Sequence, residues 1–169
     1  MEKKYRKIVF LDIDGCVNHE NWYVKTKGRS GDFDPDSIKL LNQLESIGAE
    51  VVISSSWGED AIQPLKDVGL TLPIIDCTKK LHYQFDWACR GNEIDFWLTS
   101  HFGGITTAYG DAYRHHWHPE DTDYEYVIFD DDADMLLGQA NNFIQTDRMT
   151  GITQADIDKA IKILNREAL

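Results

Sequence analysis

The stretch IVFLDIDGCVN, residues 8–18, organises the rest of the chain. Aliphatic and aromatic side chains surround two carboxylates, Asp12 and Asp14, and the apolar run stops at Gly15. This pattern predicts a strand that is buried on both faces and ends in a turn. Because an unpartnered carboxylate is costly to bury, we expect both acids at the carboxyl end of the strand, facing a cation. The simpler alternative is that Asp12 and Asp14 only stabilise the turn.

The 169-residue chain has an ordinary globular composition, with 42% hydrophobic and 27% charged residues. Its length predicts a single domain over residues 1–169. The formal charge of −12 argues against general affinity for nucleic acid backbones or anionic membranes, although it leaves room for a local basic groove. The first apolar run is too short for a signal peptide or a membrane span, so we expect no membrane partner.

The three cysteines, Cys16, Cys77 and Cys89, have no CxxC spacing and suggest neither a disulfide framework nor a zinc site. This usage favours a reducing, cytoplasmic location. Cys16 lies beside the acidic turn, but no base is adjacent to it in the sequence. We therefore expect Cys16 to be a small buried side chain rather than a nucleophile.

Strand and helix patterns alternate along the chain. After the first strand we expect strands at 49–53, 72–75, 126–129 and 143–146, and helices at 35–48, 59–68, 92–102 and from 154 onward. Asp34 and Thr153 are the candidate N-caps, Asp156 completes a capping box, and Pro64 interrupts the second helix. The alternation predicts an α/β fold with a doubly wound, Rossmann-like parallel sheet and helices on both faces.

Two segments without clear periodicity are candidates to cover the site: a small flap at about 18–33 and a long loop at about 103–123. Neither is long enough for a large cap domain, so we expect an open site with a minimal cap. The aromatic side chains of the flap, Trp22, Tyr23 and Phe33, can stack on a base or pack together. We favour packing as the flap's own small core.

Three predicted strands end in polar side chains. These are Asp12, Asp14, Ser54, Ser55, Asp130 and Asp131. Because the carboxyl ends of parallel strands meet at one edge of a sheet, we expect the strand ends to lie close together. Carboxylates without histidine or cysteine partners suit a hard cation such as Mg²⁺, and a magnesium site with a hydroxyl and a guanidinium suits phosphoryl groups.

Two other metal sites fit less well. The DxDG pattern also occurs in calcium-binding loops, but no glutamate occupies the twelfth position from Asp12. His115, His116 and His118 have no cysteine pair nearby, so we expect a solvated loop there rather than a zinc site.

The segments DIDG, VVIS, RGNEI and VIFDD, in this order, resemble the motifs of the haloacid dehalogenase (HAD) superfamily of phosphohydrolases. A closer resemblance is to the small, minimally capped HAD domains of RNA-repair and phage-like proteins. The pieces that carry it are FLDIDGCVN, ISSSW, RGNEIDFWL, VIFDDDAD and QTDRMTGIT. The resemblance covers nearly the whole chain.

The resemblance implies a role for each matching residue. Asp12 would be the nucleophile and Asp14 the general acid and base. The phosphoryl group would be bound by Ser54, Ser55 and Arg90. Mg²⁺ would be held by Asp12, Asp14 and Asp131, with Asp130 and Gly15 in supporting positions.

The chain departs from those domains at several positions. Cys16 and Val17 replace a common Val-Leu pair, and Gly58 stands where an arginine commonly follows the Ser-Ser-Trp. Lysine is the usual basic residue of the wider family. Lys79 and Lys80 therefore remain alternatives to Arg90 as the phosphate ligand.

These observations predict a magnesium-dependent phosphomonoester hydrolase that forms an aspartyl-phosphate, and its partner would be a phosphorylated small molecule, nucleotide or nucleic acid end. The alternatives are a phosphotransferase or phosphomutase, a receiver-like phosphoacceptor, and a non-catalytic nucleotide-binding module. A receiver carries its phosphorylated aspartate at the third strand and an acidic pair near its start, which Asp76 and its surroundings do not reproduce. The presence of both Asp12 and Asp14 argues against a module that has lost turnover.

Overall fold

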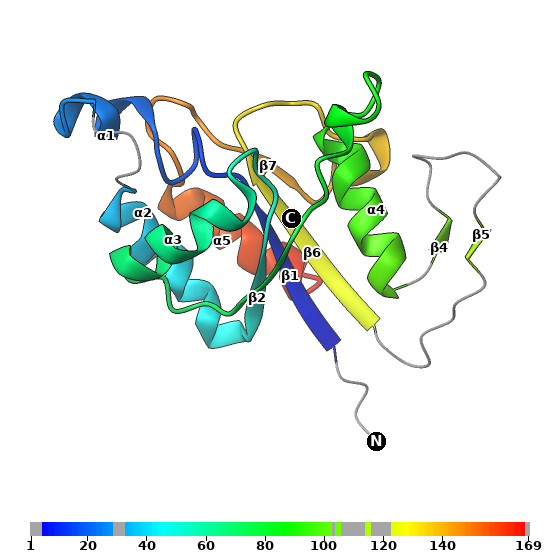
Figure 1. The fold of residues 1–169 in the computed structure, drawn as a ribbon. Helices are drawn as coiled ribbons and strands as arrows, with labels where there is room; N and C mark the ends of the chain where they lie inside the picture. The colour runs from blue at the N-terminus through cyan, green and yellow to red at the C-terminus, as the bar shows by residue number, and fades with distance from the viewer. Residues whose placement is uncertain (1–4, 29–32, 103, 106–113, 116–122, 168–169) are drawn as a thin grey trace.

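A computed structural model describes residues 5–28, 33–102, 104–105, 114–115 and 123–167. Its centre is a parallel sheet of five strands in the order β3-β2-β1-β6-β7 (Figure 1). The strands are β1 (Tyr5–Leu11), β2 (Ala49–Ile53), β3 (Ile74–Cys77), β6 (Asp123–Asp130) and β7 (Phe143–Gln145). Two further strands, β4 (Gly104–Ile105) and β5 (Arg114–His115), pair antiparallel in a separate small sheet.

The central strand β1 is buried on both of its faces. Ile8, Val9, Phe10 and Leu11 are all 0% exposed. Val9 and Leu11 pack in one apolar cluster, whereas Ile8 and Phe10 pack in the other, as the alternation of side chains along a strand requires. The continuous apolar run therefore indicates a central parallel strand, as predicted.

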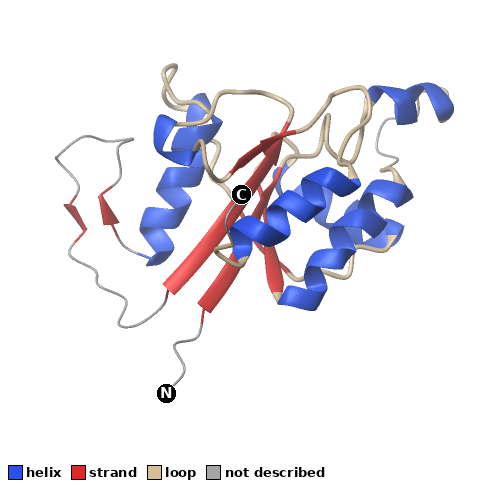
Figure 2. Cartoon of the chain, turned by 180° about the vertical axis from the view of Figure 1, so that it is seen from behind, coloured by secondary structure: helices blue, strands red, loops and turns tan. Residues whose placement is uncertain are grey.

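Helices cover both faces of the sheet (Figures 1 and 2). The larger cluster joins the sheet to α2 (Pro35–Leu41), the 3₁₀ helix η1 (Asn42–Ile47), α3 (Ile62–Val68) and α5 (Gln154–Leu164). On the opposite face, α4 (Arg90–Phe102) covers β1, β2 and β6 with Ile94, Trp97, Leu98 and Phe102. The predicted doubly wound α/β fold is confirmed.

The helix starts follow the predicted capping residues. Asp34 accepts a hydrogen bond from the Asp36 N–H, with Pro35 at the first position of α2. Thr153 and Asp156 form the expected capping box of α5. The last turns of the first predicted helix tighten into η1, which ends at Ile47 and is followed by Gly48 in the left-handed conformation.

Several predicted boundaries are wrong in detail, including those of the strand at 126–129, which spans Asp123–Asp130, and of the strand at 143–146, which spans Phe143–Gln145. The third strand spans Ile74–Cys77 rather than 72–75, since Pro73 has no N–H to donate and offers only its carbonyl to Val51, at 2.8 Å. Pro64 lies in the first turn of α3, where the missing N–H of proline costs no hydrogen bond because N–H groups there have no intrahelical acceptor. The chain before α3 forms the 3₁₀ helix η2 (Gly58–Ala61). The helix α4 begins at Arg90, two residues earlier than predicted.

The segments without periodicity contain short elements. The flap holds a helix, α1 (Glu20–Lys25), and the segment after β3 holds the 3₁₀ helix η3 (Leu81–Tyr83). Another 3₁₀ helix, η5 (Leu137–Gln139), lies between β6 and β7. The predicted long loop contains β4 and β5, and the other residues singled out in it, His116 and His118, lie outside the described residues. His115 is in β5, opposite Gly104.

The expected small core of the flap is wrong. Phe33 is only 1% exposed and belongs to the larger apolar cluster, on the face of the sheet that α2, α3 and α5 cover. Its ring meets the Trp57 ring edge-on, with 5.4 Å between the ring centres. Tyr23 is 48% exposed. Cys16, in contrast, is fully buried as expected.

Among the described residues, no helix combines the length and apolar character that crossing a membrane requires. The single-domain organisation stays a prediction.

Candidate active site

Three carboxylates meet at the carboxyl ends of β1 and β6. Asp12 follows β1, Asp130 is the last residue of β6, and Asp131 comes next. Oxygens of the three side chains lie within 4.8 Å of one another. The parallel register sets this arrangement, because Leu11 pairs with Phe129 and the Asp12 N–H donates to the Phe129 carbonyl at 2.9 Å. The predicted meeting of these two strand ends is confirmed.

Burial and mutual repulsion disfavour the ionised forms of this acid cluster, Asp12, Asp130 and Asp131. Burial is the main cause that raises the pKa of Asp12 to about 6. The pKa of Asp130 is raised to about 8 by burial first and then by the charge of Asp12. Burial also raises the pKa of Asp131, with the charge of Asp132 adding to the effect. A bound cation would reverse these shifts, and an all-oxygen donor set fits Mg²⁺.

The side chain of Asp14 points to other partners. Its Oδ1 accepts a hydrogen bond from Asn18 Nδ2 at 3.0 Å, and its Oδ2 accepts one from Trp57 Nε1 at 2.9 Å. Asp14 is exposed and is not among the three clustered carboxylates, whose third member is Asp130. The predicted ligand set of Asp12, Asp14 and Asp131 is therefore only partly brought together by side chains. An exposed carboxylate beside the cluster suits proton transfer.

Gly15 brings the turn after β1 against β6. Its φ of +72° lies in the left-handed region, and its N–H donates to the Asn18 carbonyl at 2.9 Å. A Cβ at this position would stand 2.3 Å from Cγ of Asp131. Only glycine satisfies both the conformation and the close approach.

The end of β2 contributes two hydroxyl groups. The Ser54 N–H donates to the Leu11 carbonyl at 2.8 Å, whereas the buried Ser54 Oγ has no hydrogen-bond partner among the described residues. A hydrogen bond from the Ser55 side chain lowers the pKa of Asp12, opposing the larger effect of burial. A buried hydroxyl that has no hydrogen-bond partner among the described residues, at the strand end next to β1, is an available donor for a bound oxyanion.

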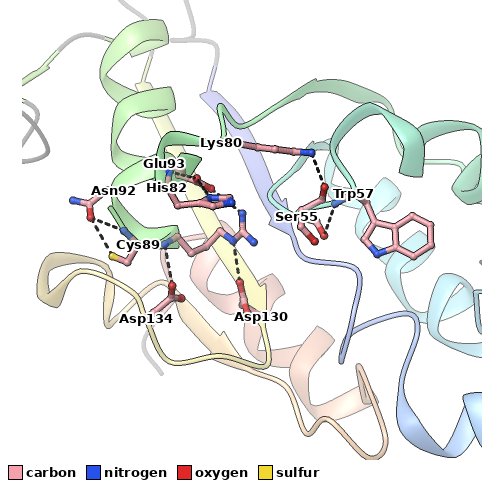
Figure 3. Close-up of polar contacts among 11 residues, drawn as sticks. Ser55, Trp57, Lys80, His82, Cys89, Asn92, Glu93, Asp130 and Asp134 are labelled. Carbon is pink, nitrogen blue, oxygen red and sulfur yellow. Dashed lines mark hydrogen bonds and ion pairs between the residues drawn. The ribbon is translucent and has the colours of Figure 1, made fainter. Parts of the chain in front are cut away.

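Arg90 supplies a guanidinium from the first residue of α4. Its Nε lies 3.7 Å from Asp130 Oδ2, and its Nη1 donates to Glu93 Oε2 at 2.8 Å (Figure 3). Glu93 is 1% exposed, and its second oxygen, Oε1, shares a hydrogen bond of 2.7 Å with His82 Nδ1. The Arg90 N–H also donates to Asp134 at 3.0 Å. The guanidinium is thus fixed facing the acid cluster.

The two alternative cations lie elsewhere. Lys80 Nζ donates to the Ser56 carbonyl at 2.6 Å, and Lys79 Nζ lies 5.2 Å from the centre of the Phe96 ring. Of the three predicted candidates, Arg90 is the one that contacts the acid cluster.

The helix α1 forms a wall beside Asp14 and Asp131. It lines a hollow of about 260 Å³ that Asp14, Asp131, Tyr23 and Arg148 share. The N–H groups at its start, of residues 20 and 21, donate at 3.1 Å to the carbonyls of Arg148 and residue 149. The flap is therefore anchored to the segment between β7 and α5.

Sequence reasoning missed four residues that hold the site: Asn18, Trp57, His82 and Glu93. Glu93 follows Arg90 by three residues on one helix, a spacing that allows an ion pair and could have marked it. Asn18, Trp57 and Glu93 lie within the motifs that carry the family resemblance, but the motifs alone indicate no role for them. Nothing in the sequence connects His82 with Glu93.

A family model described as the HAD domain in Swiss Army Knife RNA repair proteins matches residues 8–157. The chain belongs to this family. The match extends from β1 into α5, so it includes every site residue predicted from the sequence. No curated protein and no solved structure matched the chain.

The acid cluster of this HAD domain should make the metal-free protein less stable as the pH rises. The folded-state pKa values of about 6 for Asp12 and about 8 for Asp130 exceed the ordinary value of 3.8. As the pH rises, these two carboxyl groups ionise at a lower pH in the unfolded chain than in the folded protein. The stability that they contribute is therefore complete below pH 3.8 and is lost as the pH rises toward about 8.

Urea unfolding in chelator at several pH values between 4 and 8 measures this effect. Asp130→Asn should flatten the fall in unfolding free energy, whereas Asp158→Asn on the exposed side of α5 should not. An equally steep fall in the Asp130→Asn variant would contradict the assignment.

Proposed function

We propose that this HAD domain is a magnesium-dependent phosphomonoesterase that acts through an aspartyl-phosphate on a nucleotide or a nucleic acid end. The observation that carries the proposal is the acid cluster within 4.8 Å, with the Arg90 guanidinium 3.7 Å from Asp130. The Ser54 hydroxyl, which has no partner among the described residues, lies at the end of the neighbouring strand β2. The carboxylates alone would repel a phosphoryl group, but they can bind a divalent cation that accompanies it. The neighbouring guanidinium and hydroxyl can then bind the phosphoryl oxygens.

The residues present fit Mg²⁺, which Asp12, Asp130 and Asp131 would hold. When bound, Mg²⁺ supplies positive charge that reduces the repulsion between the attacking carboxylate and the phosphate oxygens. Ser54 would donate to an oxygen of the transferring group, and Arg90 would balance part of its charge. These groups are already in place before substrate binds.

The chemistry divides hydrolysis into two displacements at phosphorus. A carboxylate oxygen of Asp12 forms a bond to phosphorus while the bond to the leaving oxygen breaks, and Asp14 gives its proton to that oxygen. Water then attacks the aspartyl-phosphate and gives a proton to Asp14, and the bond to Asp12 breaks. Inorganic phosphate leaves, and both side chains return to their starting states.

Replacing the nucleophile should abolish turnover without unfolding the protein. We expect Asp12→Asn to lower phosphate release by about a thousandfold or more. Asp14→Asn should slow both steps, because it can neither give nor accept the proton. The matched control, Asp158→Asn, changes the same group on the exposed side of α5.

The assay measures phosphate release from an aryl phosphate, 5′- and 3′-mononucleotides and phosphorylated oligonucleotides, with Mg²⁺ and then with chelator. Activity that survives chelation, or near-normal turnover by Asp12→Asn, would refute the proposal. Transfer of the phosphoryl group to an added alcohol in preference to water would instead identify a phosphotransferase.

Glu93 should act as a positioning residue for Arg90. A glutamine at 93 keeps one acceptor oxygen for Arg90, but it replaces the second oxygen with an amide NH₂ and removes the negative charge that holds the guanidinium. We expect Glu93→Gln to lower kcat by roughly tenfold or more, since misplaced catalytic groups lose rate steeply.

The control for this effect is Glu45→Gln, the same change at an exposed position of η1. Equilibrium unfolding of both variants separates lost positioning from lost stability. An unchanged kcat and pH profile in Glu93→Gln would show that Arg90 needs no such support.

A further inference from the structure

The hollow beside α1 lies next to the proposed proton donor. Its volume is about 260 Å³, and its lining includes Asp14, Asp131, Tyr23 and Arg148. Asp131 belongs to the acid cluster, and Asp14 gives its proton to the leaving oxygen in the proposed chemistry. The part of the substrate that follows this oxygen therefore begins at the edge of the hollow. A volume just below the usual range of small-molecule sites suits one part of a substrate, such as a single planar ring system.

Two walls of the hollow are fixed to each other. The Glu20 N–H donates to the Arg148 carbonyl and the Asn21 N–H donates to the Met149 carbonyl, both at 3.1 Å. Figure 1 shows α1 beside the segment between β7 and α5, which carries Arg148. The side chains of Tyr23 and Arg148 therefore come from two segments that are joined through their backbones.

Tyr23 brings an aromatic ring to the first of these walls. It lines the hollow and is 48% exposed, so the flap does not bury it as core. Gly28 lies against the hydroxyl end of the ring, since a Cβ at 28 would stand 2.8 Å from Tyr23 Oη and 2.9 Å from Cζ. The ring is thus supported by backbone at one end and open beside the site. An aromatic ring in this situation can stack on a nucleobase.

Arg148 brings a guanidinium to the second wall. Its Nε lies 3.5 Å from Glu20 Oε1, and its side chain is 74% exposed. Burial and then the charge of Asp132 raise the pKa of Asp131, and the charge of Arg148 opposes them, so the guanidinium lies near the acid cluster. The planar guanidinium of arginine is weakly hydrated and stacks on aromatic rings and on bases.

The charges of the lining favour an uncharged group over an anion. Among the described residues that line the hollow, Asp14, Glu20 and Asp131 contribute three carboxylates, against the guanidinium of Arg148. A second phosphate of the substrate would be repelled there. A nucleobase carries no charge, stacks on flat side chains, and offers donors and acceptors to polar groups such as the Glu20 carboxylate and the Asn18 amide.

We propose that the hollow beside α1 binds the base next to the phosphate that is removed, with Tyr23 and Arg148 as its stacking partners. This inference rests on the proposed function and identifies both residues as determinants of specificity for a leaving group that carries a base. Two sources share this chemistry: a free mononucleotide and the phosphorylated end of a nucleic acid strand. A sugar phosphate without a base would leave both side chains without a partner.

The test pairs each nucleotide with the same molecule without its base. One pair is a nucleoside 5′-monophosphate and ribose 5-phosphate, and the other is a 5′-phosphorylated dinucleotide and its counterpart that is abasic at the 5′ position; the 3′-phosphorylated equivalents serve if the protein cleaves that end. We expect Tyr23→Leu to lower the ratio of kcat/KM for the nucleotide to that for its base-free partner by about tenfold. Tyr23→Phe, which keeps the ring, should retain the ratio, and Arg148→Met should lower it about threefold.

The base-free substrates separate stacking from a structural role. Damage to the flap would slow both members of a pair equally, and this result, an unchanged ratio in Tyr23→Leu, or a wild-type ratio near one would overturn the base subsite. The matched control, Tyr83→Leu, removes a tyrosine that is 72% exposed on η3 and does not line the hollow, so it should leave the ratio unchanged. The pair with the larger wild-type ratio identifies the source, mononucleotide or strand end.

The base subsite and the proposed function fail in distinguishable ways. Absence of turnover for every substrate refutes the proposed function. The base subsite is then judged by calorimetric titration of Asp12→Asn protein, in Mg²⁺, with the nucleoside monophosphate and with ribose 5-phosphate. Tyr23→Leu in that background should weaken nucleotide binding about tenfold and leave binding of ribose 5-phosphate unchanged. Equal affinities of the Asp12→Asn protein for the two ligands would overturn the base subsite.

Discussion

The repulsion among three carboxylates at the ends of two buried parallel strands is the constraint on which the site depends. Asp12 and Asp130 are 8% and 3% exposed, so water screens their charges weakly. The register between β1 and β6 leaves no freedom to separate them, because the strands pair up to Leu11 and Phe129. A cluster of this kind is tolerated when some of its carboxyl groups are protonated or when a cation binds to them.

The surrounding residues can be understood from that constraint. Gly15 permits the turn after β1 to approach Asp131, and Arg90 brings one positive charge toward Asp130. The buried Glu93 accepts a hydrogen bond from Arg90 Nη1 at 2.8 Å and so helps to fix the guanidinium, whose Nε lies 3.7 Å from Asp130 Oδ2. The result is a site with fixed negative and positive groups around a position where a phosphoryl group fits.

The sequence predicted those parts of the structure that follow from local pattern. The apolar run before Asp12, the run before Asp130 and the capping box at Thr153 each specify an element, and parallel pairing then brings the two strand ends together. Arg90 was found through its motif. These signals concern residues within one strand or helix, or at its end.

The rest depends on contacts between distant segments. His82 lies in a segment without periodicity and meets Glu93 only after α4 docks on the sheet. Asp14 was expected among the metal-binding side chains, but Trp57 and Asn18 engage its oxygens. The six residues of α1 carry no helical pattern strong enough to be recognised alone. The start of this helix is stabilised instead by carbonyls of the segment before α5.

The most direct test of the account is chemical trapping of the phosphorylated side chain. Protein turning over an aryl phosphate with Mg²⁺ is quenched, reduced with borohydride and digested, and the peptide that contains residue 12 is examined by mass spectrometry. We expect reduction of the acyl phosphate to give homoserine at position 12, and this product should require both substrate and Mg²⁺. Active turnover with Asp12 unmodified, or with the modification on Asp130 or Asp131, would contradict it.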